Sequence, residues 1–467
     1  MPPRTRTKDP VDRTDAWAVI GAGAHGLAAV KALREQGIAV QGYEREDDLG
    51  GNWNERATNS RVYPSTHLIS SKAFTAYPDF PMPDSYPDYP HQRQAHTYFS
   101  RYADHFGLRE DIRFGTEVVR VEPYVGPDGV TRWDVTTKSG RKTMTERFEG
   151  VVIANGHNWN PKMPDYPALD DFRAQGGTVL HSADYKGPEV LRDKRVLVVG
   201  AGNTGCDLAV ESAQQAAQTF HSMRRGYYFN PKFTQGSPSD QVNDRLLLLR
   251  VPLPVRRALY KATHAVVIGN YAKLGLRVPD HKFYETHPIV NSLLVYYVGQ
   301  GDISPRPDIA RFEGRTAVFA DDTRAEVDLV LLCTGYLVDF GFLDAHAHLN
   351  WRDTHPHLFQ HIFTPAHDTL AVSGLIQPDS GQWCLAHWQA VTIATFARAR
   401  RDRPEAAAAF FARVGEHADA RFTGGTTYKE SSRHYYEVQH QDYLASLEHT
   451  INELEGSRPY VPAGGSS

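Results

Sequence analysis

Two glycine-rich motifs in this chain have the spacing of phosphate-binding turns. The first spans residues 21–26 and contains Gly21, Gly23 and Gly26; the second spans residues 200–205 and contains Gly200, Gly202, Asn203, Thr204 and Gly205. In such a motif the first glycine permits a tight turn, the second lets the backbone approach a pyrophosphate, and the third lets a helix pack on a strand. Two copies in one chain predict two dinucleotide sites.

Each motif also has the flanking elements that this interpretation requires. An apolar run at Ala16–Ile20 precedes the first motif and a helical pattern at Leu27–Gln36 follows it; the corresponding segments of the second motif are Val196–Val199 and Cys206–Ala217. We therefore expect a strand, a glycine turn and a helix at both places, with the pyrophosphate at the N-terminus of each helix.

The residues that follow the second strand of each unit indicate which nucleotide is bound. In the first unit a strand at Ile38–Tyr43 ends at Glu44. The carboxylate of Glu44 can accept hydrogen bonds from ribose hydroxyls and repels a 2′-phosphate, so FAD or NAD is expected. In the second unit the strand ends at Ser222 and is followed by Arg224 and Arg225. A guanidinium can bind a 2′-phosphate through two hydrogen bonds, which favours NADPH.

A further segment suits a flat ring system. Gly51, Asn52 and Trp53 follow the strand that ends at Glu44. Glycine allows the chain to turn close beneath a ring, and Trp53 supplies an aromatic wall with one N–H donor. A ring-binding nucleotide and NADPH on one chain indicate a flavin and its reductant.

With these motifs in place, the sequence resembles the flavin-containing monooxygenases, a group that includes the plant YUCCA enzymes and is close to the Baeyer–Villiger monooxygenases. The resemblance extends from about Ala16 to about Ala397. It is carried by Gly21–Gly26, Gly50–Trp53, Ser70–Lys72, Asp79–Pro81, His181–Ser182 with Tyr185, Gly202–Asp207, Cys333–Tyr336 and Gly374–Pro378.

The resemblance implies a reaction and its cofactors, FAD and NADPH. NADPH reduces FAD, O₂ then forms a peroxide on the flavin, and a small-molecule substrate is oxygenated. The leading hypothesis is oxygenation of a soft nucleophile, an amine nitrogen or a sulfide sulfur. Baeyer–Villiger oxidation of a ketone or 2-oxo acid is the alternative, and an uncoupled NADPH oxidase that releases H₂O₂ is a second alternative.

The resemblance also assigns roles to individual residues. Many family members have an Asn, held to support the flavin peroxide, three residues before the position of Lys72; here that residue is Ile69. Ile69 offers no hydrogen bond, so nearby polar residues are the candidates to replace the Asn, namely His67, Ser70 and Ser71. Turn or capping hydrogen bonds are the structural alternative for the two serines. Thr334 and Gly335 are expected in the linker, and Gln377 is expected near FAD.

The linker motif departs from the family pattern at one position. The family usually has a Phe two residues before a Gly, with a His four residues after that Gly. Gly177 and His181 keep the second spacing, but Phe172 lies five residues before Gly177. The resemblance thus implies a short insertion before Gly177.

The order of the motifs implies an α/β fold of two Rossmann-like dinucleotide-binding domains, with the NADPH domain inserted into a discontinuous FAD domain. The expected boundaries are a disordered N-terminus at 1–15, FAD-domain parts at 16–157 and 331–456, the NADPH domain at 158–330, and a flexible tail at 457–467. Glycines at the crossings, Gly156 and Gly335, make a hinge between the domains a testable hypothesis.

Composition limits the other functions. The 467 residues have a formal net charge of −4, which does not favour nucleic-acid binding, and three cysteines without a C-x-x-C motif argue against a disulfide reductase. No metal-binding spacing is found among the 22 histidines. We find neither a signal peptide nor a transmembrane run, so a cytoplasmic protein is expected; a homodimer is left open.

One segment, from Leu246 to Val278, has no role in these motifs. It begins with four consecutive leucines and continues as a helical pattern that contains Arg256, Arg257 and Lys261. Three interpretations remain open: a wall or lid of the substrate channel, a patch on a membrane surface, or a helix packed on its own domain.

Overall fold

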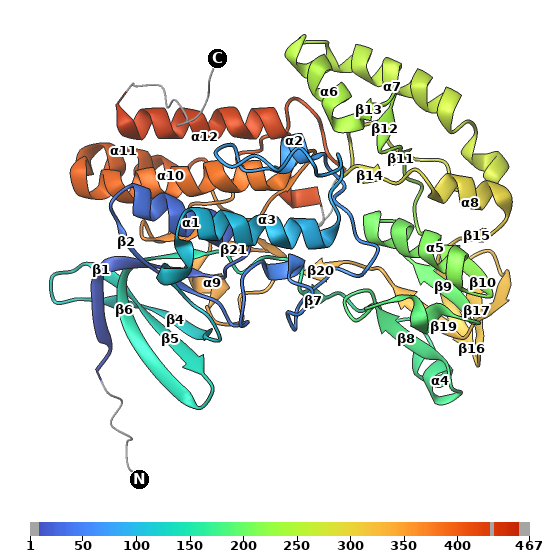
Figure 1. The fold of residues 1–467 in the computed structure, drawn as a ribbon, viewed down its shortest axis with the longest axis horizontal. Coiled ribbons are helices and arrows are strands. Elements are labelled where there is room, and N and C mark those ends of the chain that lie inside the picture. Colours follow the sequence, from blue (N-terminus) through green and yellow to red (C-terminus); the bar gives the residue numbers. More distant parts are fainter. Residues whose placement is uncertain (1–8, 430–433, 457–467) are drawn as a thin grey trace.

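The structure is a computed structural model that describes residues 9–429 and 434–456. Its two main sheets lie in two lobes that stand side by side (Figure 1). The predicted tail at 457–467 and the first eight residues of the predicted N-terminal segment lie outside the described residues.

The sheet of the first lobe contains seven strands, and its order is β3-β2-β1-β6-β5-β4 with β23 beside β6. The parallel strand β23 pairs with the second half of β6, whereas the antiparallel strand β5 pairs with the first half. The strands are β1 (Val11–Ile20), β2 (Ala39–Tyr43), β3 (Ile112–Arg113), β4 (Glu117–Val125), β5 (Thr131–Ser139), β6 (Lys142–Ile153) and β23 (Leu370–Val372).

Strand β1 is longer than the sequence indicates. Residues 11–13 pair with residues 146–148 of β6 before a register shift, and residues 17–20 pair with residues 150–153. The prediction that residues 1–15 are disordered is therefore wrong for residues 11–15. Their side chains are polar or exposed, so the apolar pattern misses them, but backbone pairing of residues 11–13 with β6 extends the strand.

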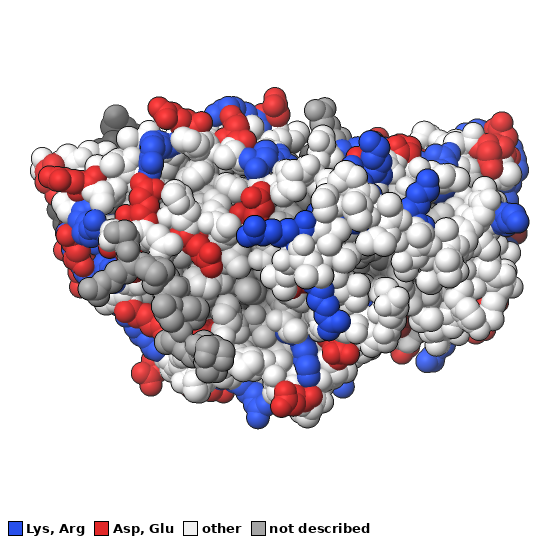
Figure 2. Space-filling view, turned by 90° about the horizontal axis from the view of Figure 1, so that it is seen from above, with Lys and Arg blue, Asp and Glu red and all other residues white. Residues whose placement is uncertain are grey.

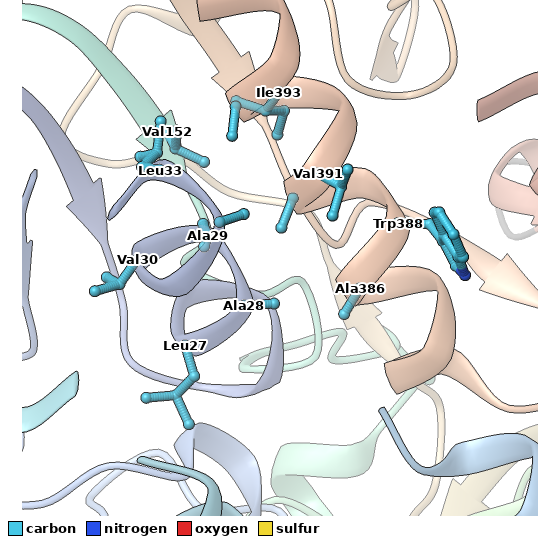
Figure 3. Packing of buried hydrophobic residues seen from close by; sticks show 14 of the residues in the cluster. Leu27, Ala28, Ala29, Val30, Leu33, Val152, Ala386, Trp388, Val391 and Ile393 are labelled. Carbon is cyan, nitrogen blue, oxygen red and sulfur yellow. The ribbon is translucent and has the colours of Figure 1, made fainter. Parts of the chain in front are cut away.

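Helices cover one face of this sheet, above it in Figure 1. Helix α1 packs on α10, and the alanines Ala28 and Ala386 lie on the facing sides of the two helices, which allows a close approach (Figure 3). The side chain of Leu27, also on α1, is fully buried and contributes about 2 kcal/mol. The helices of this lobe are α1 (Ala24–Glu35), α2 (Lys72–Thr75), α3 (Gln92–His105), α9 (Ala345–His348), α10 (Gln382–Asp402), α11 (Pro404–Val414) and α12 (His440–Glu455).

The second lobe has a five-stranded parallel sheet of order β15-β10-β9-β19-β8. Its strands are β8 (Thr178–His181), β9 (Arg195–Val199), β10 (Gln218–Ser222), β15 (Ile303–Arg306) and β19 (Leu329–Leu332). Around it lie α4 (Leu169–Ala174), α5 (Asn203–Gln215), α8 (Leu294–Gln300) and the antiparallel strands β16 (Ile309–Glu313), β17 (Thr316–Phe319) and β18 (Arg324–Glu326).

Both sheets place their glycine turn at the same topological position. Strand β1 lies between β2 and β6, and β9 lies between β10 and β19, so each turn follows a strand from which the chain winds in opposite directions. Ligands bind at such switch points in open α/β sheets. The α/β fold with two dinucleotide-binding units is therefore confirmed, while the exact domain boundaries stay predictions.

Two short connectors join the lobes and pair with each other. Strand β7 (Asn160–Pro161) is antiparallel to β20 (Tyr336–Leu337). Beside them, Gly156 and Gly335 have φ angles of 71° and 82°, in the left-handed region that favours glycine. The paired connectors thus lie next to the two positions proposed as a hinge.

The segment with four leucines forms parts of two consecutive helices joined by a turn, called the α6–α7 hairpin below. Helix α6 (Ser239–Leu248) is followed by α7 (Leu253–Val267), and both lie at the top of the second lobe (Figure 1). Among the described residues, no helix combines the length and the apolar composition needed to cross a bilayer.

Candidate active site

A cavity of about 480 Å³ follows the C-terminal end of β1. Six residues that the sequence predicts for FAD line it: Gly21, Gly23, Glu44, Gly51, Asn52 and Trp53. They come from the turn after β1, the end of β2 and the segment that follows it. The structure thus brings together residues that are up to 32 positions apart in the sequence.

The glycine turn shows why each glycine is needed. Gly21 has a φ of 102°, and a Cβ atom built on Gly26 would lie 1.8 Å from the Gly21 carbonyl oxygen. Gly26 is therefore the packing glycine and does not line the cavity. Gly23 caps α1 without a side-chain hydrogen bond, so the N–H groups of the first helical turn are available to a phosphate.

Glu44 is fixed at the end of β2 by two backbone donors. Its Oε2 accepts a hydrogen bond from the Ala22 N–H at 2.8 Å, and its Oε1 accepts one from the Glu46 N–H at 3.0 Å. Burial raises the pKa of Glu44 above its ordinary value, although these N–H groups oppose the shift. The remaining lone pairs of the oriented carboxyl group can accept hydrogen bonds from ribose hydroxyls.

The other end of the cavity is aromatic. The rings of Trp53 and Trp383 meet edge to face with their centroids 5.5 Å apart, and both residues line the cavity. Gly51 has a φ of 53°, and a Cβ atom there would lie 3.2 Å from the Gly23 Cα. Only a glycine lets this segment lie against the phosphate turn, so the ring-binding end and the pyrophosphate-binding end are built as one unit.

Two buried histidines in the cavity wall were not predicted from the sequence. The Nδ1 of His25 is 3.1 Å from the Ser373 Oγ, while the Nε2 atoms of His25 and His157 have no protein partner. Burial lowers the pKa of His25 to about 3 and that of His157 to about 4, so both are neutral. A buried nitrogen without a partner fits a ligand that supplies one.

His25 belongs to a longer buried network. The Ser373 Oγ donates to the Gln389 Oε1 at 3.3 Å, and the Gln389 Nε2 donates to the Tyr443 hydroxyl at 2.6 Å. These residues come from four segments far apart in the sequence, so no local motif connects them. The only available signal was Gly374, next to Ser373, which lines the cavity and belongs to a motif of the resemblance.

The second glycine turn repeats the geometry of the first. Gly200 has a φ of 109°, and a Cβ atom on Gly205 would lie 1.9 Å from the Gly200 carbonyl oxygen. Gly202 caps α5 without a side-chain hydrogen bond, and Thr204 is half-buried in its first turn. This helix N-terminus therefore offers a second set of N–H groups to a phosphate.

Asn203, which was also predicted for NADPH, braces a neighbouring loop. Its Oδ1 accepts from the Val290 N–H at 2.7 Å, and its Nδ2 donates to the Pro288 carbonyl at 3.2 Å. Both ends of the side-chain amide are thus engaged within the protein. The backbone N–H at this position, rather than the side chain, is the group suited to a nucleotide.

The residues expected at the 2′-phosphate lie beyond β10. Ser222 is buried and its Oγ donates to the Pro307 carbonyl at 2.8 Å, so its hydroxyl is already occupied. Arg224 and Arg225 follow it and are both exposed. Because the Gly200 N–H donates to the Ser222 carbonyl at 3.0 Å, the two arginines begin next to the glycine turn.

The predicted peroxide-supporting residues do not line the cavity. His67 is exposed, and the Ser70 Oγ forms a hydrogen bond with the Thr75 Oγ1 at 2.8 Å. The backbone N–H of Ser71 donates to the Asp240 Oδ2 of α6 at 2.6 Å. The structure places this segment on the seam between the lobes, and a role of these three residues in catalysis stays a prediction.

The predicted linker residues lie at the connectors. The Thr334 Oγ1 donates to the Lys162 carbonyl at 2.6 Å, and the Lys162 N–H donates to the Gly335 carbonyl at 2.9 Å. Gln377, predicted near FAD, lies in β24 (Gln377–Pro378), which pairs with β25 (Glu437–Val438), and is not among the residues that line the cavity.

The insertion before Gly177 does not separate Phe172 from that glycine. The Gly177 N–H donates to the Phe172 carbonyl at 2.9 Å, and a Cβ atom on Gly177 would lie 2.3 Å from the Phe172 ring. The ring therefore packs on the glycine despite the altered spacing. His181 ends β8 with its ring 5.5 Å from that of Tyr336 in β20.

The described residues do not form a metal-binding site. Among residues 9–429 and 434–456, no group of three or more His, Cys, Asp or Glu side chains is arranged to hold a metal ion. The cavity wall, by contrast, fits FAD: it combines a glycine cradle, an oriented acidic residue, an aromatic end and two histidine nitrogens without partners.

Comparison with known proteins agrees with this geometry. The flavin-binding monooxygenase-like family model matches residues 14–461. The chain is 32% identical to human flavin-containing monooxygenase 5 over 459 residues, which cover 95% of this chain and 83% of the relative. It is 34% identical to pig flavin-containing monooxygenase 1 over 376 residues, which cover 77% and 69% of the two chains.

Solved structures share the fold. A cyclohexanone monooxygenase in an open crystal structure has a TM-score of 0.68 at 18% identity and covers 96% of this chain and 99% of its own. The S-allyl-L-cysteine S-oxygenase of Allium sativum has a TM-score of 0.65 at 20% identity and covers 97% and 90%. The match of the family model to nearly the whole chain establishes that this protein belongs to the flavin-binding monooxygenase-like family.

Proposed function

We propose that this enzyme, an NADPH- and O₂-dependent FAD monooxygenase, oxygenates a nitrogen or sulfur atom of a small molecule. One oxygen atom of O₂ is transferred to the substrate, NADPH supplies two electrons, and the other oxygen atom leaves as water. The bound flavin supplies the redox and oxygen chemistry. The chain's own residues bind the two nucleotides, orient them and exclude water.

Binding and orientation are divided among named groups. The helix N-terminus after Gly23 would hold the pyrophosphate, and Glu44 would hold the ribose. The aromatic end at Trp53 and Trp383 would cover the ring and keep water away from it. His25 and His157 would stand as neutral side chains in the wall beside the cofactor.

The distribution of cations in the cavity wall carries the choice of reaction. Among the residues that line the cavity, Arg45 is the one Lys or Arg, and it neighbours Glu44, the residue proposed to hold the ribose. Baeyer–Villiger oxidation proceeds through an anionic oxygen nucleophile, which a nearby cation would stabilise. A neutral amine or thioether attacks as the nucleophile and has no need of that cation, so the wall favours nitrogen or sulfur oxygenation.

The similar proteins support the same proposal. One similar structure is that of an S-oxygenase, and the relatives compared above are flavin-containing monooxygenases. Cyclohexanone monooxygenase shares the fold, so ketone oxidation is the alternative reaction that the experiment must distinguish from nitrogen or sulfur oxygenation.

The test measures how NADPH consumption is divided among products. Purified enzyme is supplied in parallel with a thioether, a tertiary amine and a cyclic ketone, while NADPH consumed, oxygenated product and H₂O₂ are quantified. We expect sulfoxide or N-oxide to account for most of the NADPH. A lactone as the main product, or H₂O₂ equal to the NADPH consumed with every compound, contradicts the proposal. The Gly26→Ala variant is the flavin-free control.

A further inference from the structure

The helical hairpin α6–α7 is built with its apolar side outward. In α7, Arg256 and His264 are buried, with 8% of each residue exposed. Val266 is 87% exposed, and Val255 and Leu259 are nearly half exposed. The inward side of α7 packs on its own lobe, where the Tyr271 hydroxyl is 2.8 Å from the His264 Nε2. The outward side is unusually apolar, because a surface helix normally exposes polar side chains.

The exposed side chains form a continuous stripe. Val255, Leu259, Ala262 and Val266 follow one another at spacings of four, three and four residues, which places them on one face of the helix. At the turn between α6 and α7, Leu248 and Leu249 are 71% and 75% exposed. Seven of the eighteen large hydrophobic side chains found exposed in the described chain lie between residues 248 and 278.

Basic residues predominate from the end of α6 onward. Residues 245–277 contain seven Lys or Arg and no Asp or Glu, in a chain whose formal net charge is −4. The exposed members are Arg245, Arg250, Lys261, Lys273 and Arg277. In the part of the chain that the structure describes, none of these five forms an ion pair with a carboxylate. In Figure 2 the surface over α6 and α7 is largely uncharged, with basic and some acidic side chains around it.

We propose that the α6–α7 hairpin docks onto an anionic membrane surface. Apolar side chains from one helix face can enter the boundary between headgroups and acyl chains, while basic side chains around them bind anionic headgroups. Lys261, one turn from the stripe, can extend its ammonium group toward the headgroups while its stem covers apolar surface. The hairpin lies on the surface and does not cross the bilayer, in agreement with its length.

Charge decides against a second copy of this chain as the occupant. In a two-fold interface the same patch meets itself, so five exposed cations would face five others. The two carboxylates of α6, Asp240 and Asp244, already accept hydrogen bonds from Ser71 and Gln441 of the same chain. Such an arrangement is repulsive. A surface rich in anionic lipid has the complementary charge and also accepts the aliphatic side chains.

The hairpin is also attached to the seam between the lobes. On the inward side of α6, Asp240 accepts the hydrogen bond from the Ser71 N–H. The Lys232 Nζ, just before α6, donates to the Leu68 carbonyl at 3.3 Å. Docking would therefore place the seam near the membrane, where apolar substrates are concentrated.

The test is co-sedimentation of the full-length holoenzyme with vesicles of phosphatidylcholine alone or with 30 mol% phosphatidylserine. We expect binding to the anionic vesicles, little to the neutral ones, and a reduction of at least tenfold in 0.5 M NaCl. The variants Leu249→Glu and Val266→Glu should reduce binding at least tenfold. They should keep FAD content and NADPH turnover in solution, because both side chains are exposed.

Val125→Glu is the matched control, because Val125 is 64% exposed but lies at the end of β4 in the other lobe; it should bind like the native chain. Equal binding of the native chain and the hairpin variants would overturn the proposal, as would the absence of any binding to anionic vesicles. Sedimentation velocity adds a second readout. A native dimer that Val266→Glu converts to a monomer would show that a second copy covers the stripe, which also overturns the proposal.

Discussion

Replacement of Arg224 by alanine should weaken NADPH binding and leave NADH binding unchanged. The side chain starts two residues after β10, next to the second glycine turn, and is exposed. The backbone there is fixed independently of this side chain. The Met223 N–H donates to the Arg306 carbonyl at 2.9 Å, and the Arg277 Nη1 donates to the Arg224 carbonyl at 2.7 Å. The substitution therefore removes a guanidinium without moving the loop.

The expected magnitude follows from the exposure of the side chain. A hydrogen bond to a charged group contributes about 1.5–3 kcal/mol, and solvent screening at an exposed position favours the lower value. A loss of about 1.5 kcal/mol corresponds to a roughly tenfold increase in Kd. NADH has no 2′-phosphate, so its Kd should change by less than about twofold.

Stopped-flow reduction of the FAD at increasing coenzyme concentration measures both constants. Arg225→Ala is the matched control, because it removes the same charge from the neighbouring exposed position. The reasoning is refuted if Arg224→Ala weakens NADPH and NADH equally, since general charge or loop damage would then be the cause. A tenfold loss in Arg225→Ala alone would assign the phosphate to Arg225 instead.

Three further predictions test the two turns, the connectors and one buried histidine. This is His221 of β10, whose Nε2 lies 2.9 Å from the Gly200 carbonyl oxygen. Gly26→Ala should yield protein without FAD, whereas Gly205→Ala should keep its visible absorbance and lose NADPH affinity, because each Cβ overlaps the carbonyl of its own turn; loss of FAD in both would refute separate sites. Gly335→Ala should slow flavin reduction if the connector rotates, whereas Gly129→Ala, equally left-handed and unobstructed, should not; equal rates exclude the hinge. Burial lowers the pKa of His221 to about 4, so the stability that the neutral ring contributes is present above pH 6.5 and is lost as the pH falls. The free energy of unfolding should decrease by about 2 kcal/mol between pH 7 and pH 5 on this account. His221→Gln should flatten the fall in thermal midpoint between pH 7 and 5, and an unchanged profile contradicts this.

The predictions that hold are those that depend on local chemistry. The turn at residues 21–26 could be located because its function requires glycines at fixed spacing beside a strand, and Glu44 because it ends the next strand. These constraints act within about 25 residues and are visible in one sequence. The start of β1 was misplaced because its first residues are held by backbone pairing with β6, which leaves no apolar pattern.

The residues that were missed are those that tertiary contacts bring together. His25 lines the cavity because Ser373, 348 residues later, fixes its ring, and no spacing rule connects the two. Asn203 and Ser222 were assigned to NADPH by position, and that assignment stays a prediction. Both side chains are occupied within the protein, which only the folded structure shows.

The seam between the lobes shows how the two nucleotide sites depend on one short segment. The Ser65 Oγ donates to the Glu211 Oε2 of α5 at 2.9 Å, and the Ser71 N–H donates to Asp240 of α6. Residues 65–71 of the first lobe therefore contact both the helix that begins at the second glycine turn and the exposed hairpin. Movement of either element must be accommodated by this segment, because the paired connectors hold the opposite side of the lobes together. His67, Ser70 and Ser71 are thus placed where NADPH binding, domain rotation and membrane docking would all alter their surroundings.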